Sequence, residues 1–97
     1  MCGIFGSTRK LSNQALSSVM DLLDHRGPNS QGHELLVSSA SEHPVIFAHT
    51  RLAIQDLSAS GHQPMTSKNR RWCITFNGEI YNHFELRSKL TTNFRGT

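Results

Sequence analysis

The chain opens with the sequence MCGIFG (residues 1–6), in which a cysteine directly follows the initiator methionine. The apolar run from Cys2 to Gly6 is short and bounded by glycine, a pattern typical of a buried strand. Cys73 is the only other cysteine and lies far along the chain, so no local disulfide explains Cys2. Its position reflects either chemistry at the chain terminus or accident, and the rest of the sequence decides between them.

Length and composition predict one small globular domain. The chain has 97 residues, of which 36% are hydrophobic and 18% are charged, a balance typical of folded proteins. No apolar run approaches the roughly 18 residues of a membrane span, and no charged segment precedes an apolar core as in a secretory signal. Two distant cysteines fit a reducing compartment, so we expect a cytoplasmic protein without membrane contact.

The charged and titratable residues do not indicate nucleic acid or metal binding. A net charge of +3 would suit a nucleic-acid partner, but the basic residues are dispersed. The one cluster, KNRRW (residues 68–72), lies in a polar loop, and we interpret it as a solvated surface rather than a phosphate-binding patch. The six histidines show no paired ligand spacing. We therefore expect neither a nucleic-acid partner nor a metal site.

A helical pattern follows the opening strand. Four apolar residues recur at the spacing of one face of an amphipathic helix: Leu16, Val19, Met20 and Leu23. Ser12 is predicted as the N-cap. His25 and Arg26 are predicted in the last turn, where cations suit the helix dipole, and Gly27-Pro28 ends the helix.

The remainder of the chain alternates strand-like runs with polar segments. Strands are predicted over residues 33–39, 44–51 and 72–76, the last of them buried and ending in an Asn-Gly turn. Residues 55–70 are predicted as a long loop. Asn82 and Glu85 have the spacing of a capping box for a second helix that ends at about Leu90. The order of elements predicts an α+β layered fold with a mostly antiparallel sheet.

An N-terminal cysteine can provide both nucleophile and base. Cysteine is a small second residue that allows removal of the methionine, which would leave Cys2 at the N-terminus. Free α-amines titrate near about 7.7–8.0, so a useful fraction is neutral at cellular pH and can accept the thiol proton. Cys2 alone is weak support for this chemistry, because any residue can follow Met1 by chance.

Four segments, in order along the chain, carry a resemblance to a known family. They are MCGIFG, DHRGPNSQG (residues 24–32), HTRLAIQDLSASGHQPM (residues 49–65) and FNGEIYN (residues 76–82). Together they resemble the class II glutamine amidotransferases, and more narrowly the N-terminal glutaminase domain of glutamine-hydrolysing asparagine synthetases. The resemblance runs from Met1 to about Phe94. It implies an α+β fold of the N-terminal-nucleophile hydrolase type, a layered αββα sandwich with antiparallel sheets, incomplete in this chain.

The resemblance implies a catalytic role for three residues. Cys2 would attack the side-chain amide of glutamine to form a γ-glutamyl thioester and release ammonia, and water would then free glutamate. The α-amine of Cys2 would carry the proton between these steps. Asn77 and Gly78 match the family's oxyanion hole, formed by a side-chain amide N–H and a backbone N–H. A plain hairpin turn is the alternative for this Asn-Gly pair.

Substrate binding is implied at two further segments. Arg51 matches the arginine that binds the substrate α-carboxylate, which a planar guanidinium can do through two hydrogen bonds. Glu79 matches the acidic residue that contacts the α-ammonium group. The alternatives are an ordinary strand-end arginine and an ordinary turn carboxylate. The substrate-contacting stretch of the family corresponds to Arg51, Leu52, Ala53, Ile54 and Gln55.

Other polar residues near these motifs are expected to have supporting roles. Arg26 and Gly27 are implied to lie in a loop beside Cys2 without reacting. His25 and His49 are interpreted as structural, because the terminal amine already provides a base. Cys73 is expected to pack in a strand.

The resemblance also implies parts that this chain does not hold. In the family, the stretch at the end of this chain leads into a Ser-Asp pair whose aspartate is a second anchor for the substrate ammonium. We therefore expect residues 1–97 to be a partial glutaminase domain without its C-terminal part and without the synthetase domain, and weakly active or inactive alone. No cofactor is expected in this part, whereas ATP and Mg²⁺ would bind the synthetase domain, which would make asparagine from aspartate. The implied partners are L-glutamine and the C-terminal synthetase domain of the same chain, and a homodimer is a further option.

Two other interpretations stay open. In one, the ammonia goes to a different acceptor, such as a sugar or a peptide carboxylate, because the acceptor domain decides that choice. In the other, the chain is a non-catalytic remnant that keeps the glutamine pocket. A retained Met1 would favour the remnant, because a blocked amine cannot act as the base.

Overall fold

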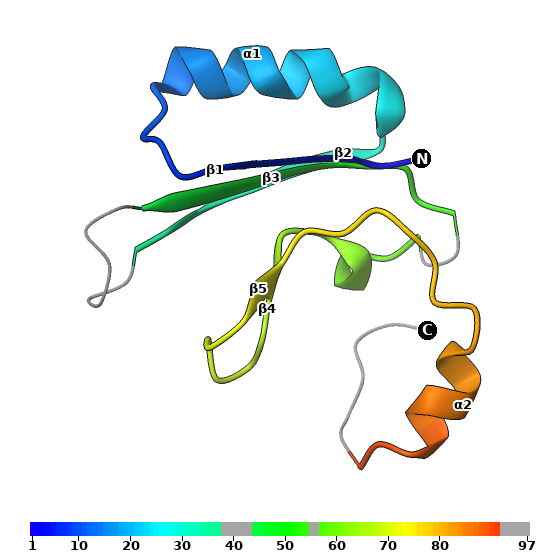
Figure 1. The fold of residues 1–97 in the computed structure, drawn as a ribbon. Helices are drawn as coiled ribbons and strands as arrows, with labels where there is room; N and C mark the ends of the chain where they lie inside the picture. The colour runs from blue at the N-terminus through cyan, green and yellow to red at the C-terminus, as the bar shows by residue number, and fades with distance from the viewer. Residues whose placement is uncertain (38–43, 55–56, 92–97) are drawn as a thin grey trace.

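The computed structural model describes residues 1–37, 44–54 and 57–91, which form an α+β structure with antiparallel sheets. Figure 1 shows one helix above the larger sheet and a small second sheet below it. This arrangement confirms the predicted α+β class. None of the described helices is long and apolar enough to cross a membrane. In chain order the elements are β1 (Gly3–Ser7), α1 (Asn13–Leu23), a 3₁₀ helix (Asp24–Arg26), β2 (Ser30–Leu36), β3 (Val45–Arg51), a 3₁₀ helix (Ala59–Gly61), β4 (Met65–Thr66), β5 (Cys73–Ile74) and α2 (His83–Ser88).

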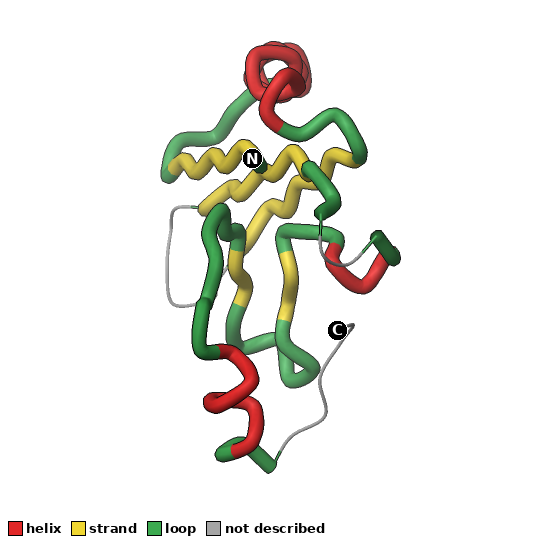
Figure 2. The backbone as a smooth tube through the Cα atoms, turned by 90° about the vertical axis from the view of Figure 1, so that its right-hand side faces the viewer, coloured by secondary structure: helices red, strands yellow, loops and turns green. Residues whose placement is uncertain are grey.

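Strand β3 is the centre of the larger sheet, whose strand order is β1-β3-β2. Both neighbours run antiparallel to it, and Thr50 of β3 pairs with Gly3 of β1 on one side and with Gln31 of β2 on the other. The three strands form a single layer beneath α1 (Figure 2). With a neighbour on each edge and α1 above, β3 is the most buried of the described strands.

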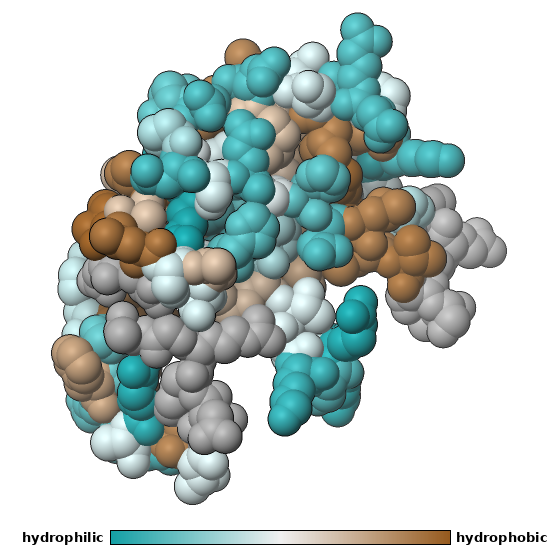
Figure 3. All heavy atoms as spheres, turned by 180° about the vertical axis from the view of Figure 1, so that it is seen from behind, coloured by the Kyte–Doolittle hydropathy of each residue, from teal (hydrophilic) through white to brown (hydrophobic). Residues whose placement is uncertain are grey.

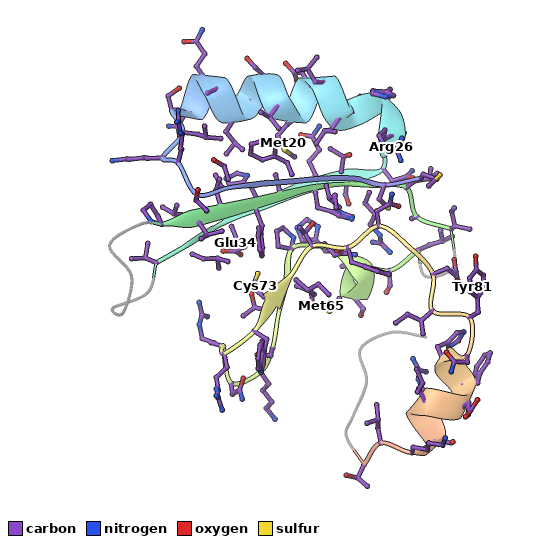
Figure 4. All side chains as sticks on the ribbon, viewed as in Figure 1. Met20, Arg26, Glu34, Met65, Cys73 and Tyr81 are labelled. Carbon is purple, nitrogen blue, oxygen red and sulfur yellow. The ribbon has the colours of Figure 1, made fainter. Side chains whose placement is uncertain are left out.

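Alternation along β3 separates a core face, toward α1, from an opposite face that carries His49 and Arg51. Side chains of successive residues point to opposite faces of a strand. The core lies between α1 and the sheet, and Figure 4 shows Met20 reaching from α1 toward the strands. His49 and Arg51 point away from α1, where their side chains bond to Phe76 and Ser58. The core residues are Leu16, Met20, Ile46 and Ala48, with Phe5 and Leu11 partly buried beside them.

Helix α1 begins as the sequence predicts. Ser12 is its N-cap, and the Ser12 side chain accepts a hydrogen bond of 3.1 Å from the N–H of Ala15. This bond satisfies one of the backbone donors that a helix leaves unpaired in its first turn. Leu16 and Met20 are buried, so the predicted apolar face is the face that meets the sheet.

The end of α1 differs from the prediction. The α-helix stops at Leu23, and His25 and Arg26 lie in the following 3₁₀ helix instead of the last α-helical turn. Pro28 explains where the 3₁₀ helix ends, because a proline disfavours helical backbone angles in the residue before it. Gly27 accordingly has φ −153° and ψ 80°, which lie outside the helical region.

The hydroxyl group of Thr50 joins three elements in the interior. Thr50 is fully buried at 0% exposure. Its Oγ1 accepts a hydrogen bond of 3.2 Å from the N–H of Gly3 and donates one of 2.9 Å to the carbonyl of Leu23. The hydroxyl therefore ties the start of β1 and the end of α1 to the central strand, close to Cys2.

His49 is also buried, with 1% of its surface exposed. Its Nε2 lies 3.3 Å from the carbonyl oxygen of Phe76, which can only accept, so Nε2 is the donor. Burial disfavours the charged imidazole and lowers the pKa of His49 below its ordinary value, and the charges of His62 and Arg51 act in the same direction. The hydrogen bond to Phe76 opposes this lowering of the pKa only in part.

The second sheet departs from the prediction in two ways. Residues 55–70, predicted as a loop, contain a 3₁₀ helix and strand β4, whose Met65 pairs with Ile74 of β5. The predicted buried strand over residues 72–76 is reduced to Cys73–Ile74 and is exposed, with 72% of Trp72 and 52% of Ile74 accessible. An apolar run predicts burial only where another layer covers it, and among the described elements β4 and β5 pack mainly against each other. Figure 3 shows apolar side chains at the molecular surface.

Two further boundaries are corrected by the structure. The strand predicted over residues 33–39 lies at Ser30–Leu36, and residues 38–43 are outside the described part. The predicted second helix is present but ends at Ser88, not at Leu90. Its predicted capping box is wrong, because the side chain of Asn82 makes no capping hydrogen bond. With φ −100° and ψ 32°, Asn82 lacks the extended backbone that an N-cap residue normally has.

Replacing the buried Thr50 hydroxyl tests its role in the fold. We expect Thr50→Val to lower the free energy of unfolding by about 1–3 kcal/mol, because it leaves the N–H of Gly3 and the carbonyl of Leu23 without this partner. Denaturant unfolding measures the change, with Thr8→Val at an exposed position as the matched control. Equal losses in the two variants would show that the buried bridge contributes nothing specific.

The lowered pKa of His49 predicts how stability depends on pH. The unfolded chain takes up a proton on this histidine near pH 6.5, whereas the folded protein does so only at a lower pH, so the free energy of unfolding should fall as the pH drops below about 6.5. Unfolding experiments from about pH 7 down to pH 5 measure this slope. In His49→Gln the slope should be shallower, and an unchanged slope would contradict the assignment.

Candidate active site

One cavity gathers most of the predicted site residues. Its volume is about 400 Å³, and it lies where the N-terminus, the end of β3 and the segment after β5 meet. The predicted residues that line it are Cys2, Arg51, Leu52, Ala53, Ile54, Asn77, Gly78 and Glu79. Met1, His49, Gly61, Gln63, Phe76 and Tyr81 also line it. Residues from four separate segments thus meet in one place.

Cys2 is held beside the end of β3 by the pairing of β1. Because Gly3 pairs with Thr50, the preceding residue comes next to the residues that follow Thr50. The N–H of Leu52 donates to the Cys2 sulfur at 3.4 Å, and the thiol reaches the carbonyl oxygen of the same residue at 3.7 Å. These two contacts orient the sulfur at the cavity wall.

Arg26 contacts Cys2, and Gly27 packs against the end of β3. The Nε of Arg26 donates a hydrogen bond of 3.1 Å to the carbonyl oxygen of Cys2 and fixes its main chain. Figure 4 shows Arg26 at the end of the larger sheet where the chain begins. Gly27 packs so closely against the backbone of Thr50 and Arg51 that any Cβ at this position would overlap it. Glycine is therefore required where this loop crosses the end of β3.

Arg51 is the last residue of β3, and its guanidinium forms part of the cavity wall. Its Nη1 donates a hydrogen bond of 2.6 Å to the carbonyl oxygen of Ser58. Gly61 lies against the same guanidinium, so a side chain at that position would displace it. The 3₁₀ helix Ala59–Gly61 thus packs beside Arg51 and restricts where its cationic group can point.

The segment after Arg51 is held by Asn29, to which the sequence analysis assigned no role. The N–H of Asn29 donates to the carbonyl of Arg51 at 2.9 Å, and its Oδ1 accepts from the N–H of Ala53 at 3.0 Å. Ile54 is largely exposed at the rim. Gln55, the last residue of the predicted substrate-contacting stretch, lies outside the described residues.

Asn77, Gly78 and Glu79 reach the cavity from the segment after β5. Phe76, at the start of this segment, has its N–H bonded to Oε1 of Gln63 at 2.6 Å and its carbonyl bonded to His49. A Cβ on Gly78 would meet the end of the Phe76 ring at 2.8 Å, so a larger residue here would require the ring to shift. The Asn-Gly pair leads into a bend at the cavity, and no hairpin forms there among the described strands.

Sequence reasoning did not assign three residues that the structure brings to the site: Asn29, Gln63 and Tyr81. Gln63 lies within the motif of residues 49–65, and this position was the only sequence indication of a role. Its hydrogen bond to Phe76 spans 13 positions and cannot be inferred from sequence spacing. Tyr81 is almost fully exposed beside Glu79 at the rim. No group of three or more metal-ligating side chains is present among the described residues.

Comparison with known proteins identifies the family of the chain. The family described as "Glutamine amidotransferase domain" matches residues 1–97. The chain is 37% identical over 102 residues to asparagine synthetase [glutamine-hydrolyzing] 1 of Saccharomyces cerevisiae, a match that covers all of this chain and 16% of the relative. It is 39% identical over 101 residues to asparagine synthetase [glutamine-hydrolyzing] of Zea mays, covering 96% of this chain and 16% of the relative.

A further relative has a different name. The chain is 35% identical over 80 residues to amidase chyE of Penicillium rubens, covering 82% of this chain and 11% of that protein. The chain thus spans less than a fifth of the length of these three relatives. No solved structure matches it. Because the family match extends over all 97 residues, the chain belongs to the glutamine amidotransferase domain family.

Proposed function

We propose that this domain hydrolyses the side-chain amide of L-glutamine, with Cys2 as the nucleophile. One observation carries the proposal: the cavity joins Cys2 to Arg51 and to Asn77, Gly78 and Glu79, although these residues come from segments far apart in the chain. A thiol, a guanidinium, an amide with a glycine N–H, and a carboxylate are the groups needed to attack an amide and to bind an amino acid.

The proposed reaction begins at the Cys2 sulfur. The sulfur forms a bond to the side-chain carbonyl carbon of glutamine, and the thiol proton passes to the α-amine of Cys2. The carbon–nitrogen bond then breaks, and the amine returns the proton to the leaving ammonia. Water attacks the thioester carbon and gives a proton to the amine, the carbon–sulfur bond breaks to release glutamate, and the amine returns the proton to the sulfur. In this sequence the Cys2 nitrogen is bonded to Met1, so the proposal requires removal of Met1.

The other cavity residues take the roles that the family resemblance implies, and their charge and hydrogen-bonding type fit those roles. The side-chain amide of Asn77 and the N–H of Gly78 would donate to the tetrahedral oxygen, and losing one such donor typically costs about 10²–10³ in rate. Arg51 would bind the substrate α-carboxylate and Glu79 the α-ammonium group. The hydrogen bonds that Arg51 donates to the Ser58 carbonyl and that the Ala53 N–H donates to Asn29 support this side of the cavity.

We also propose that the fold is part of a layered αββα sandwich of the N-terminal-nucleophile type. The support is the order of layers, since α1 covers one face of the larger sheet and the small β4-β5 sheet lies on the other (Figure 1). The exposed side chains of Ile74 in β5 and of Trp72 just before it agree with a sheet that has further neighbours in a complete domain.

For the intact protein we propose that the ammonia is used to make asparagine from aspartate. The support is the similarity to two proteins named as glutamine-hydrolysing asparagine synthetases, both several times longer than this chain. ATP and Mg²⁺ would bind in a C-terminal synthetase domain of the same protein, not among residues 1–97. The chain is also similar to a protein with a different name, an amidase, and a second candidate is an amidotransferase with a different acceptor. An assay of the intact protein with aspartate, glutamine, ATP and Mg²⁺ separates the two candidates. Asparagine forms only if the protein is an asparagine synthetase.

Covalent labelling tests the nucleophile without requiring turnover. We expect a diazoketone analogue of glutamine to add one label at Cys2, because its carbonyl occupies the position of the scissile amide and the sulfur displaces dinitrogen. Mass spectrometry of peptides locates the label and reports whether Met1 has been removed. Cys2→Ala should abolish labelling, whereas Cys73→Ala, outside the cavity, should not affect it. Labelling that persists in Cys2→Ala, or follows Cys73, would overturn the assignment.

Protection by glutamine tests the carboxylate site. Glutamine should slow the alkylation of Cys2 by iodoacetamide, and Arg51→Met should raise the glutamine concentration needed for half-protection by about tenfold or more, because hydrogen bonds to charged groups contribute about 1.5–3 kcal/mol. Arg9→Met, which replaces an arginine outside the cavity, is the matched control. Equal protection in both variants would rule out a role for Arg51 in binding.

A further inference from the structure

The segment that carries Asn77 and Gly78 is attached to the larger sheet by side chains, although it is not a strand of that sheet. Thr75 Oγ1 donates a hydrogen bond of 3.2 Å to the carbonyl of Ala48 in β3. One residue later, the carbonyl of Phe76 accepts from His49 Nε2, at 3.3 Å, also in β3. The segment therefore follows β3 without forming a backbone ladder with it.

Phe76 is held on both of its backbone polar groups. Its carbonyl is bonded to His49, and its N–H donates to Oε1 of Gln63 at 2.6 Å. Holding both the N–H and the carbonyl of one residue restricts the rotations that would move the residue after it. That residue is Asn77, followed by Gly78, and both line the cavity.

The two groups that hold Phe76 are supported by the larger sheet. His49 is buried within β3. The main chain of Gln63 packs against Gly32 of β2 so closely that a Cβ on that glycine would overlap the Gln63 carbonyl oxygen. His49 thus reaches Phe76 from β3, and Gln63 reaches it from a loop that packs against β2. The residue after Cys2 is paired to the same sheet through β1.

We propose that Gln63 is a positioning residue, whose side-chain carbonyl, together with His49, fixes the Phe76 backbone and so places the oxyanion donors Asn77 and Gly78 relative to Cys2. The inference rests on the proposed function of these residues in glutamine hydrolysis. It assigns Gln63 an effect on the reaction through the backbone of Phe76, not through contact with substrate. Misplacement of catalytic groups by about 1 Å can cost roughly 10²-fold in rate.

Substrate contact is the competing role, because Gln63 also lines the cavity. The two roles differ in what a substitution changes. Loss of a substrate contact raises the glutamine concentration needed for half-protection of Cys2, whereas displacement of the oxyanion donors lowers the maximal rate at saturating ligand. The choice of substituting residue also separates the two roles, since only a side chain with a hydrogen-bond acceptor can bond to the Phe76 N–H.

The experiment compares Gln63→Met, which has a similar length but no oxygen acceptor, with Gln63→Glu, which keeps one. Gln31→Met is the matched control, since Gln31 bonds to Asp24 away from the cavity. Hydrogen exchange at the Phe76 amide is measured first because it needs no activity. We expect exchange to accelerate by roughly fivefold or more in Gln63→Met, as for loss of one hydrogen bond, and to stay near the original rate in Gln63→Glu.

Labelling of Cys2 gives the second readout. In Gln63→Met the rate of Cys2 labelling at saturating glutamine diazoketone should fall about tenfold or more, and the diazoketone concentration for half-saturation should change little. The rate of alkylation by iodoacetamide should also change little, because iodoacetamide does not need the oxyanion donors. Gln63→Glu should recover most of the loss. Unchanged amide exchange, or a change confined to half-saturation, would overturn the positioning role. Absence of Cys2 labelling in the unsubstituted protein would instead overturn the proposed function, whatever the exchange data show.

Discussion

The antiparallel pairing of β1 with β3 is the interaction on which the site depends. Its register places Gly3 opposite Thr50, and the buried Thr50 hydroxyl then bonds both to Gly3 and to the end of α1. A strand at a chain terminus frays unless something holds it. Here the ladder and the hydroxyl hold β1 up to the residue after Cys2, so the thiol is fixed beside Leu52 although it lies at the end of the chain.

Alternate residues of the central strand β3 face the core and the cavity. Ile46, Ala48 and Thr50 face α1 and supply the interior, whereas His49 and Arg51 face the cavity side. A rigid strand is a precise support for a site, because its backbone is hydrogen-bonded on both edges. The interior on the α1 side is small, and the residues of the second sheet contribute little to it.

Local features of the fold were predictable from the sequence, and features that depend on distant neighbours were not. The Ser12 cap and the buried face of α1 follow from helical periodicity, which involves only residues a few positions apart. Residues 72–76 form an apolar run, from which a buried strand was predicted. Burial depends on a covering layer that the run itself does not reveal, and Trp72 is exposed. Strand β4 is too short for periodicity to detect, because two residues show no alternation.

The sequence by itself determined the family and the residue types of the site, because four short motifs carry them and the family match extends over the same residues. Only the tertiary structure decided how those residues meet. The Cys2 sulfur contacts Leu52, and Arg26 bonds to the Cys2 carbonyl. Gln63 and His49 bond to the N–H and the carbonyl of Phe76. These contacts join residues 13 to 50 positions apart. Strand register and close packing at glycine create them, and neither is visible in the order of the residues.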